Sequence, residues 1–196
     1  TCRADDTEAL MSELKLSIWR FYQDYGKPDR LIIHYYKKKL NKRESALVER
    51  MLSRMKIKCP IYVINIVSAV NEDLIAFDEE HPDRMPLSGT YVHLRQDEYL
   101  LYNNERYAKG KKADTLYPIK LTITQGGSNT PAAPLAPLVA KQLITQVYQF
   151  CRLYWKSVKM QRVPITIAYP EMVAQCVPHF KAEELPEYGR QHLWML

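Results

Sequence analysis

The sequence predicts an α/β fold with a mixed or parallel sheet, and two observations support this prediction. Helical and strand patterns alternate over the first third of the chain, in the order helix, strand, helix, strand. The two strand patterns, residues 30–36 and 60–67, are apolar almost throughout rather than at every second position. Continuous apolar runs are typical of strands that are covered on both faces, and the alternation is typical of sheets with helical crossover connections.

The elements of the first half have recognisable ends. Residues 8–25 carry apolar side chains at helical spacing, and the Gly-Lys-Pro sequence that follows ends this helix. A second helix is predicted over residues 41–56, because Asn41 can cap its first turn and Glu44 follows three residues later. Residues 71–86 are polar and are predicted to form a loop.

The second half is predicted to contain a hairpin, two further strands, an amphipathic helix and a last helix. A Gly/Pro-rich connector over residues 126–137 precedes the amphipathic helix, and Pro170 suits the first turn of the last helix. The predicted strands are residues 89–94 and 98–102, which form the hairpin, and residues 118–124 and 164–169.

The amphipathic helix is predicted to continue to Lys159 and to separate its charges by face. At about 100° per residue, Lys156 and Lys159 fall within about 40° of Arg152. The apolar residues lie near the opposite side of the helix: Val139, Leu143, Val147, Phe150 and Tyr154. Arg162 continues the cationic row. Such a row can bind the backbone of a polyanion or can be an ordinary solvated face, and the pattern alone favours neither.

Composition narrows the class of protein. Of the 196 residues 46% are hydrophobic and 11% aromatic, as in folded globular domains. We find no apolar run of about 18 residues and no secretory signal, so we expect no membrane association and a cytoplasmic protein. The net charge of +6 mildly favours an anionic partner. The four cysteines are far apart in sequence, which argues against a zinc site or a disulfide framework.

Several short sequences, taken in their order, resemble the C-terminal half of the PIWI domain of Argonaute proteins, most closely the prokaryotic ones. The resemblance covers nearly the whole chain. The sequences that carry it are residues 28–34 (PDRLIIH), 89–92 (GTYV), 147–154 (VYQFCRLY), 163–169 (VPITIAY), 173–174 (VA) and the apolar end 193–196 (LWML).

This resemblance implies an RNase H-like mixed sheet flanked by helices, which holds a guide oligonucleotide and the target strand paired to it. Residues 1–196 would be the C-terminal part of the PIWI domain, and its upstream strands and the MID and N-terminal parts would lie outside this sequence. Active members bind two divalent metal ions through carboxylates. Lys37 falls near the position of the second catalytic Asp, and Glu171 falls at the fourth ligand position. We therefore expect no catalytic residues and an inactive site, because an ammonium group cannot bind Mg²⁺.

The resemblance also assigns binding residues. The row of Arg152, Lys156, Lys159 and Arg162 matches the region that contacts guide phosphates, and Tyr169 matches a tyrosine near such a phosphate. Lys37 would face the channel. The C-terminal carboxylate of Leu196 would hold Mg²⁺ at the 5′ phosphate of the guide. Such inactive proteins act in prokaryotic defence against invading DNA, together with an associated effector protein.

Two alternatives stay open. The first is an active guide-directed endonuclease that depends on a divalent metal. The second is a scaffold that binds a protein through an RNase H-like sheet, for which exposed aromatic residues would serve: Tyr91, Tyr99, Tyr102 and Tyr107. His34, within an apolar strand, is interpreted as a hydrogen-bonded core residue rather than a catalytic one.

Overall fold

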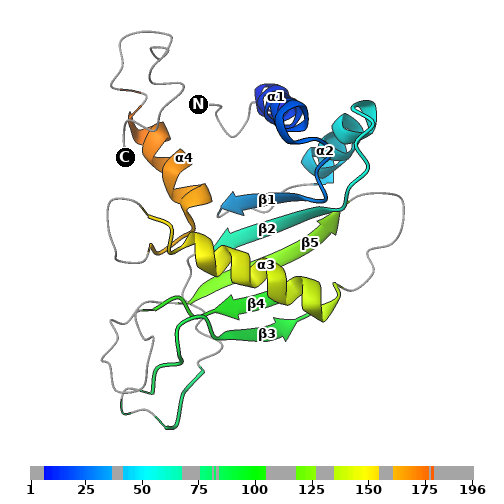
Figure 1. Ribbon diagram of the computed structural model, residues 1–196. Coiled ribbons are helices and arrows are strands. Elements are labelled where there is room, and N and C mark those ends of the chain that lie inside the picture. The colour runs from blue at the N-terminus through cyan, green and yellow to red at the C-terminus, as the bar shows by residue number, and fades with distance from the viewer. Residues whose placement is uncertain are drawn as a thin grey trace.

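A five-stranded mixed sheet with helices on both faces forms the centre of the computed structural model (Figure 1). The structure describes residues 7–36, 42–67, 76–80, 82, 84–104, 118–126, 135–154, 161–176 and 178. In chain order the elements are α1 (Thr7–Tyr25), β1 (Leu31–Tyr36), α2 (Lys42–Arg54), β2 (Ile61–Val67), β3 (Tyr91–Arg95), β4 (Glu98–Leu101), β5 (Ile119–Gly126), α3 (Pro137–Phe150) and α4 (Ile165–Cys176).

The strand order is β1-β2-β5-β4-β3, so β1 and β3 are the two edges of the sheet. Among the strands that the structure describes, β1 and β2 alone are parallel, with Ile33 opposite Val63, and the helical crossover through α2 connects them. The pairs β2–β5, β5–β4 and β4–β3 are antiparallel. The predicted mixed sheet flanked by helices is therefore confirmed.

The sequence of β2 is apolar except at Asn65, because both faces of this strand pack against hydrophobic cores. Ile64 and Ile66 are fully buried on the face that α3 covers (Figure 1). Ile61 and Val63 are buried on the other face, against α1 and α2. A strand buried on both sides has no position at which a polar residue would face water.

The prediction of a strand over residues 164–169 is wrong, because these residues open helix α4. The amides of Ile167 and Ala168 both donate to the carbonyl of Pro164, which starts the helix. Pro170 consequently lies inside α4 rather than in its first turn. A proline there removes one helical hydrogen bond at a cost of about 3 kcal/mol. The helix persists because Ile167 is buried in the core beneath α3.

Candidate nucleic-acid interface

The amphipathic helix is shorter than predicted, and this changes the geometry of the cationic row. Helix α3 ends at Phe150, and the amide of Gln161 donates to the carbonyl of Cys151 over 2.8 Å. A helix continuing through this segment would separate those residues by about 15 Å. Arg152 thus lies beyond the end of α3, so the prediction that the helix continues past this residue is wrong.

The guanidinium of Arg152 is held by hydrogen bonds to other residues of the chain. Its Nη2 donates to the Ser88 hydroxyl over 2.6 Å and to the carbonyl of Asn104 over 3.1 Å. Its Cζ lies 4.7 Å from the centre of the Tyr148 ring, and the Tyr148 hydroxyl donates to the same Ser88 oxygen. Arg152 therefore ties the end of α3 to segments far away in the sequence.

A second contact holds Gln161 beside the partners of Arg152. The side-chain amide of Asn103 donates to the carbonyl of Gln161 over 2.8 Å, and Asn103 is buried. A glycine is required beside this cluster: Gly89 has φ of +88°, and a Cβ there would lie 3.3 Å from the Tyr148 ring. We name Ser88, Asn103, Asn104, Tyr148 and Arg152 the arginine clamp.

Two other predicted binding residues lie near the end of α3. Arg162 is exposed and comes directly after Gln161. Tyr169, on α4, is half-buried, and its hydroxyl donates to the carbonyl of Leu153 over 3.3 Å. The structure thus brings Arg152 and Tyr169 to the same junction between α3 and α4. The predicted residues Lys37, Lys156, Lys159 and Leu196 lie outside the described residues.

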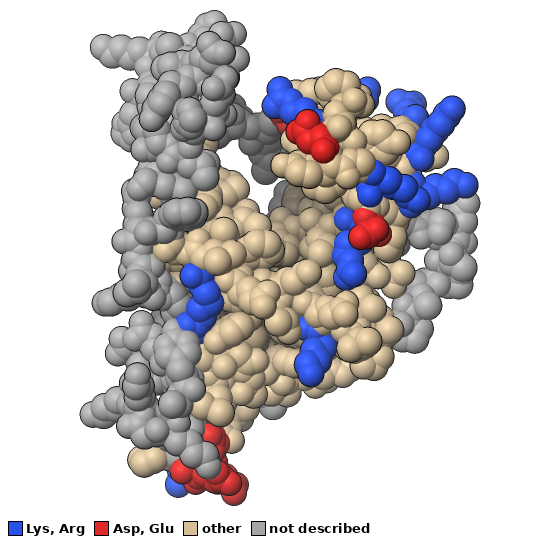
Figure 2. Space-filling view, in the orientation of Figure 1, with Lys and Arg blue, Asp and Glu red and all other residues tan. Residues whose placement is uncertain are grey.

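The described cations do not form a continuous row on the face that Figure 2 shows. Lys and Arg side chains gather over α1 and α2, and elsewhere on this face they stand singly in a mostly uncharged surface. The prediction that Tyr99 and Tyr102 are exposed is wrong, because each is only 5% exposed, whereas Tyr91 is 37% exposed. Tyr107 lies outside the described residues.

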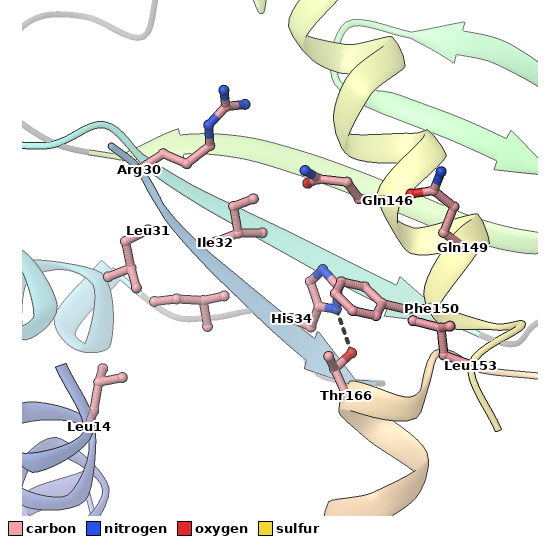
Figure 3. A pocket seen from close by; sticks show the side chains of 11 residues that line it. Leu14, Arg30, Leu31, Ile32, His34, Gln146, Gln149, Phe150, Leu153 and Thr166 are labelled. Atoms are coloured by element: carbon pink, nitrogen blue, oxygen red, sulfur yellow. Dashed lines mark hydrogen bonds between the residues drawn. The ribbon is translucent and has the colours of Figure 1, made fainter. Parts of the chain in front are cut away.

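A hollow of about 710 Å³ lies beside β1, with walls from α1, α3 and the start of α4 (Figure 3). His34 projects into it, and its Nδ1 lies 2.6 Å from the Thr166 hydroxyl, which confirms the predicted hydrogen-bonded histidine. Burial lowers the pKa of His34 from 6.5 to about 4, so the ring is neutral at pH 7. Sequence reasoning missed Thr166, because it was assigned to a strand, and no sequence signal connects it to His34.

The described residues give no metal-ligating cluster. No three His, Cys, Asp or Glu side chains gather within the described ranges, and Glu171 is exposed on α4.

Cys151 is fully buried, and burial raises the pKa of its thiol to about 12, so it stays protonated. Cys151 is therefore a core residue. Within the same ranges, none of the helices has both the length and the apolar character needed to span a bilayer.

Comparison with known proteins gives a match by structure alone. No protein-family model matches the sequence, and neither does any curated protein. Two crystal structures of Marinitoga piezophila Argonaute match with a TM-score of 0.59 and 12% sequence identity. One is a complex with 5′ OH guide RNA and target DNA, and the other is a complex with 5′ OH guide RNA.

The chain has an Argonaute PIWI-like α/β fold. The match covers 86% of this chain and 22% of the Argonaute, so the chain spans about a fifth of the length of that protein. The architecture that supports the assignment is the mixed sheet with α3 on one face and α1 and α2 on the other.

Proposed function

We propose that this chain is part of a protein that binds a short guide oligonucleotide and, through it, a complementary target strand. The observation that carries the proposal is the PIWI-like fold, shared with an Argonaute that was crystallised with guide RNA and target DNA. The net charge of +6 also suits an anionic partner. The target would be recognised by base pairing, and the protein would contact backbone phosphates.

The phosphate contacts are proposed at the junction of α3 and α4. Arg162 is exposed there, and the segment between Cys151 and Gln161 carries Lys156 and Lys159. Tyr169 and Lys37 complete the proposed set. For Arg152 we propose a positioning role in place of a phosphate contact, because its guanidinium bonds Ser88 and Asn104 and so holds the end of α3 in place.

We further propose that the site does not cleave the target. By the resemblance, Lys37 falls near the position of a metal-binding Asp, and lysine offers no lone pair to Mg²⁺ while it is protonated. The terminal carboxylate of Leu196 is proposed to hold one Mg²⁺ at the guide 5′ phosphate, since a carboxylate oxygen is a hard ligand that suits this ion. We also propose that the protein acts in the cytoplasm, together with an effector protein, in defence against invading DNA.

A salt titration of guide binding tests the phosphate contacts. Log K falls as log salt rises, and the double variant Lys156→Glu/Arg162→Glu should make this slope less steep by roughly 1.4–1.8, the value for two lost phosphate contacts. The matched control is Lys15→Glu/Arg20→Glu, which changes the charge equally at exposed positions of α1. Equal slopes for the two double variants would exclude the proposed interface.

A cleavage assay on the unmutated protein tests the proposal that the site does not cleave the target. With a matched guide and target, and with Mg²⁺ or Mn²⁺ present, we expect the target to remain intact. A metal-dependent product that chelation abolishes would instead support the endonuclease alternative.

A further inference from the structure

Helices α1 and α2 pack against each other on one face of the sheet, and a hollow of about 330 Å³ lies between them (Figure 1). Figure 2 shows Lys and Arg side chains gathered over these two helices. Residues about one helical turn apart line the hollow on each helix, so each helix contributes one face. We name this hollow the α1–α2 groove and define it by six of the residues that line it: Met11, Lys15, Leu47, Arg50, Met51 and Arg54.

The inner wall of the α1–α2 groove is apolar. Met51 is 8% exposed, and Met11 and Leu47 are half-buried. Methionine side chains are flexible and polarisable, so they adapt to the shape of an incoming side chain. No aromatic ring is among the described residues that line the groove, so it offers no platform on which a nucleobase would stack.

The cations of the groove are Lys15, Arg50 and Arg54, and all three are exposed. Arg50 and Arg54 are four positions apart on α2, so their side chains are neighbours on one face of the helix. Among the described residues, none of these three side chains has an ion-pair or hydrogen-bond partner. Their charges are therefore available to a partner molecule.

The described acidic side chains of α2 face the sheet instead of the groove. Glu44 is buried, and after burial itself its charge is the second cause that raises the pKa of Tyr35 on β1. Oε1 of Glu49 lies 3.6 Å from the position that a Cβ on Gly126 would take, at the end of β5. Neither carboxylate is among the described residues that line the groove.

The acidic residues of α1 whose side chains the structure describes lie on the other side of that helix. At about 100° per residue, Glu13 and Asp24 fall about 160° and about 180° from Lys15. The groove thus combines an apolar inner wall with three exposed cations and no described acidic side chain. Its complement is a segment that carries carboxylates beside an apolar side chain.

We propose that the α1–α2 groove binds an acidic amphipathic segment of a partner protein. An apolar side chain of that segment would enter the groove against Met11 and Met51, and carboxylates one helical turn apart would pair with Arg50 and Arg54. Charge complementarity identifies this occupant, because the cations exclude a basic segment and the apolar wall suits an anchoring side chain. The inference goes beyond nucleic-acid binding and does not depend on it, since α3 covers the opposite face of the sheet.

Fluorescence anisotropy with a synthetic peptide tests the proposal. The peptide has about 16 residues, enough to form a helix, with a Glu pair four positions apart and a Leu on the same face. Arg50→Glu/Arg54→Glu should weaken its binding at least about tenfold, because two attractive ion pairs become repulsive contacts. The matched control Arg20→Glu/Lys58→Glu makes the same charge change at exposed positions that do not line the groove, so binding should change less than about twofold.

NMR spectroscopy of methionine methyl groups locates the peptide on the unmutated protein, so this readout does not depend on how a variant folds. At saturation, the peptide should shift the signals of Met11 and Met51. The signal of Met85, which is described and does not line the groove, should stay in place. Replacing the Leu of the peptide with Ala should weaken binding about tenfold, because the apolar wall then loses its contact.

Four results would overturn the proposal. The first is the absence of peptide binding, or binding that leaves the Met11 and Met51 signals unshifted. The second is an equal loss of binding in the two double variants, because overall charge alone would then attract the peptide. The third is displacement of the peptide by a single-stranded oligonucleotide that shifts the same signals, because the groove would then bind nucleic acid. The fourth is the same shifts without peptide in a dimer detected by light scattering, because a second copy would then be the occupant.

Discussion

Replacing Arg152 with alanine should destabilise the chain strongly, although arginine is a residue usually found at surfaces. The variant removes the hydrogen bonds that this charged group donates, among them those of 2.6 Å to Ser88 and 3.1 Å to Asn104. Hydrogen bonds from charged groups contribute about 1.5–3 kcal/mol each, and the contact with the Tyr148 ring adds about 0.5–1 kcal/mol. Since Arg152 is only half-buried, we expect a total loss of about 3 kcal/mol.

Urea unfolding followed by circular dichroism measures this loss, and the thermal midpoint should fall by about 10 °C. Arg152→Lys should recover about half of it, because an ammonium group lacks the planar fork of donors. Arg162→Ala is the matched control: the residue is exposed, and its removal should change stability by less than about 0.5 kcal/mol.

A double-mutant cycle between Arg152→Ala and Ser88→Ala separates the clamp from general packing. The two residues are 64 positions apart in sequence and joined by the 2.6 Å bond, so we expect a coupling of about 1–2 kcal/mol. If Arg152→Ala is no more destabilising than Arg162→Ala, or if the cycle shows no coupling, the clamp is not the structural anchor described above.

Two further predictions concern the cores on either side of this junction. The folded-state pKa of His34, about 4, lies below its usual 6.5, so the unfolded chain binds more protons between these two pH values. The free energy of unfolding should therefore be highest above pH 6.5 and fall by about 2 kcal/mol toward pH 4. In acid unfolding curves, His34→Gln should lose less stability over this range than the wild type does. A wild-type loss no greater than that of His34→Gln would contradict this. Leu143→Ala should lower the free energy of unfolding by about 2–5 kcal/mol, because Leu143 is fully buried. Leu138→Ala, at an exposed position of the same helix, should lower it by less than about 0.5 kcal/mol in urea unfolding. Similar losses for the two variants would refute the placement of α3.

Much of the sheet could be predicted from local patterns. Both parallel strands were found because the two faces of each pack against different apolar cores, so that each has an almost continuous apolar sequence. The hairpin of β3 and β4 and the strand β5 were found from apolar segments between turn sequences. These signals come from the residues of each element, so no knowledge of distant partners was needed.

The candidate site was harder to predict, because its contacts join segments far apart in sequence. The helical pattern continued past Phe150, since Tyr154 is apolar at the expected spacing, but the bond between Gln161 and Cys151 reverses the chain. Arg152 therefore appeared to belong to a solvent-facing row, although its partner Ser88 lies on another loop. Residues 164–169 were misassigned because Ile and Thr favour strands in isolation.

By itself the sequence determined the order of the elements from α1 to α3 and their apolar faces, because the period of apolar residues depends on local backbone geometry. The tertiary structure decided where α3 ends, that α4 is a helix and that Arg152 faces inward. Each of these outcomes depends on the free energy of contacts between distant residues, such as the burial of Ile167 beneath α3, which no local pattern contains.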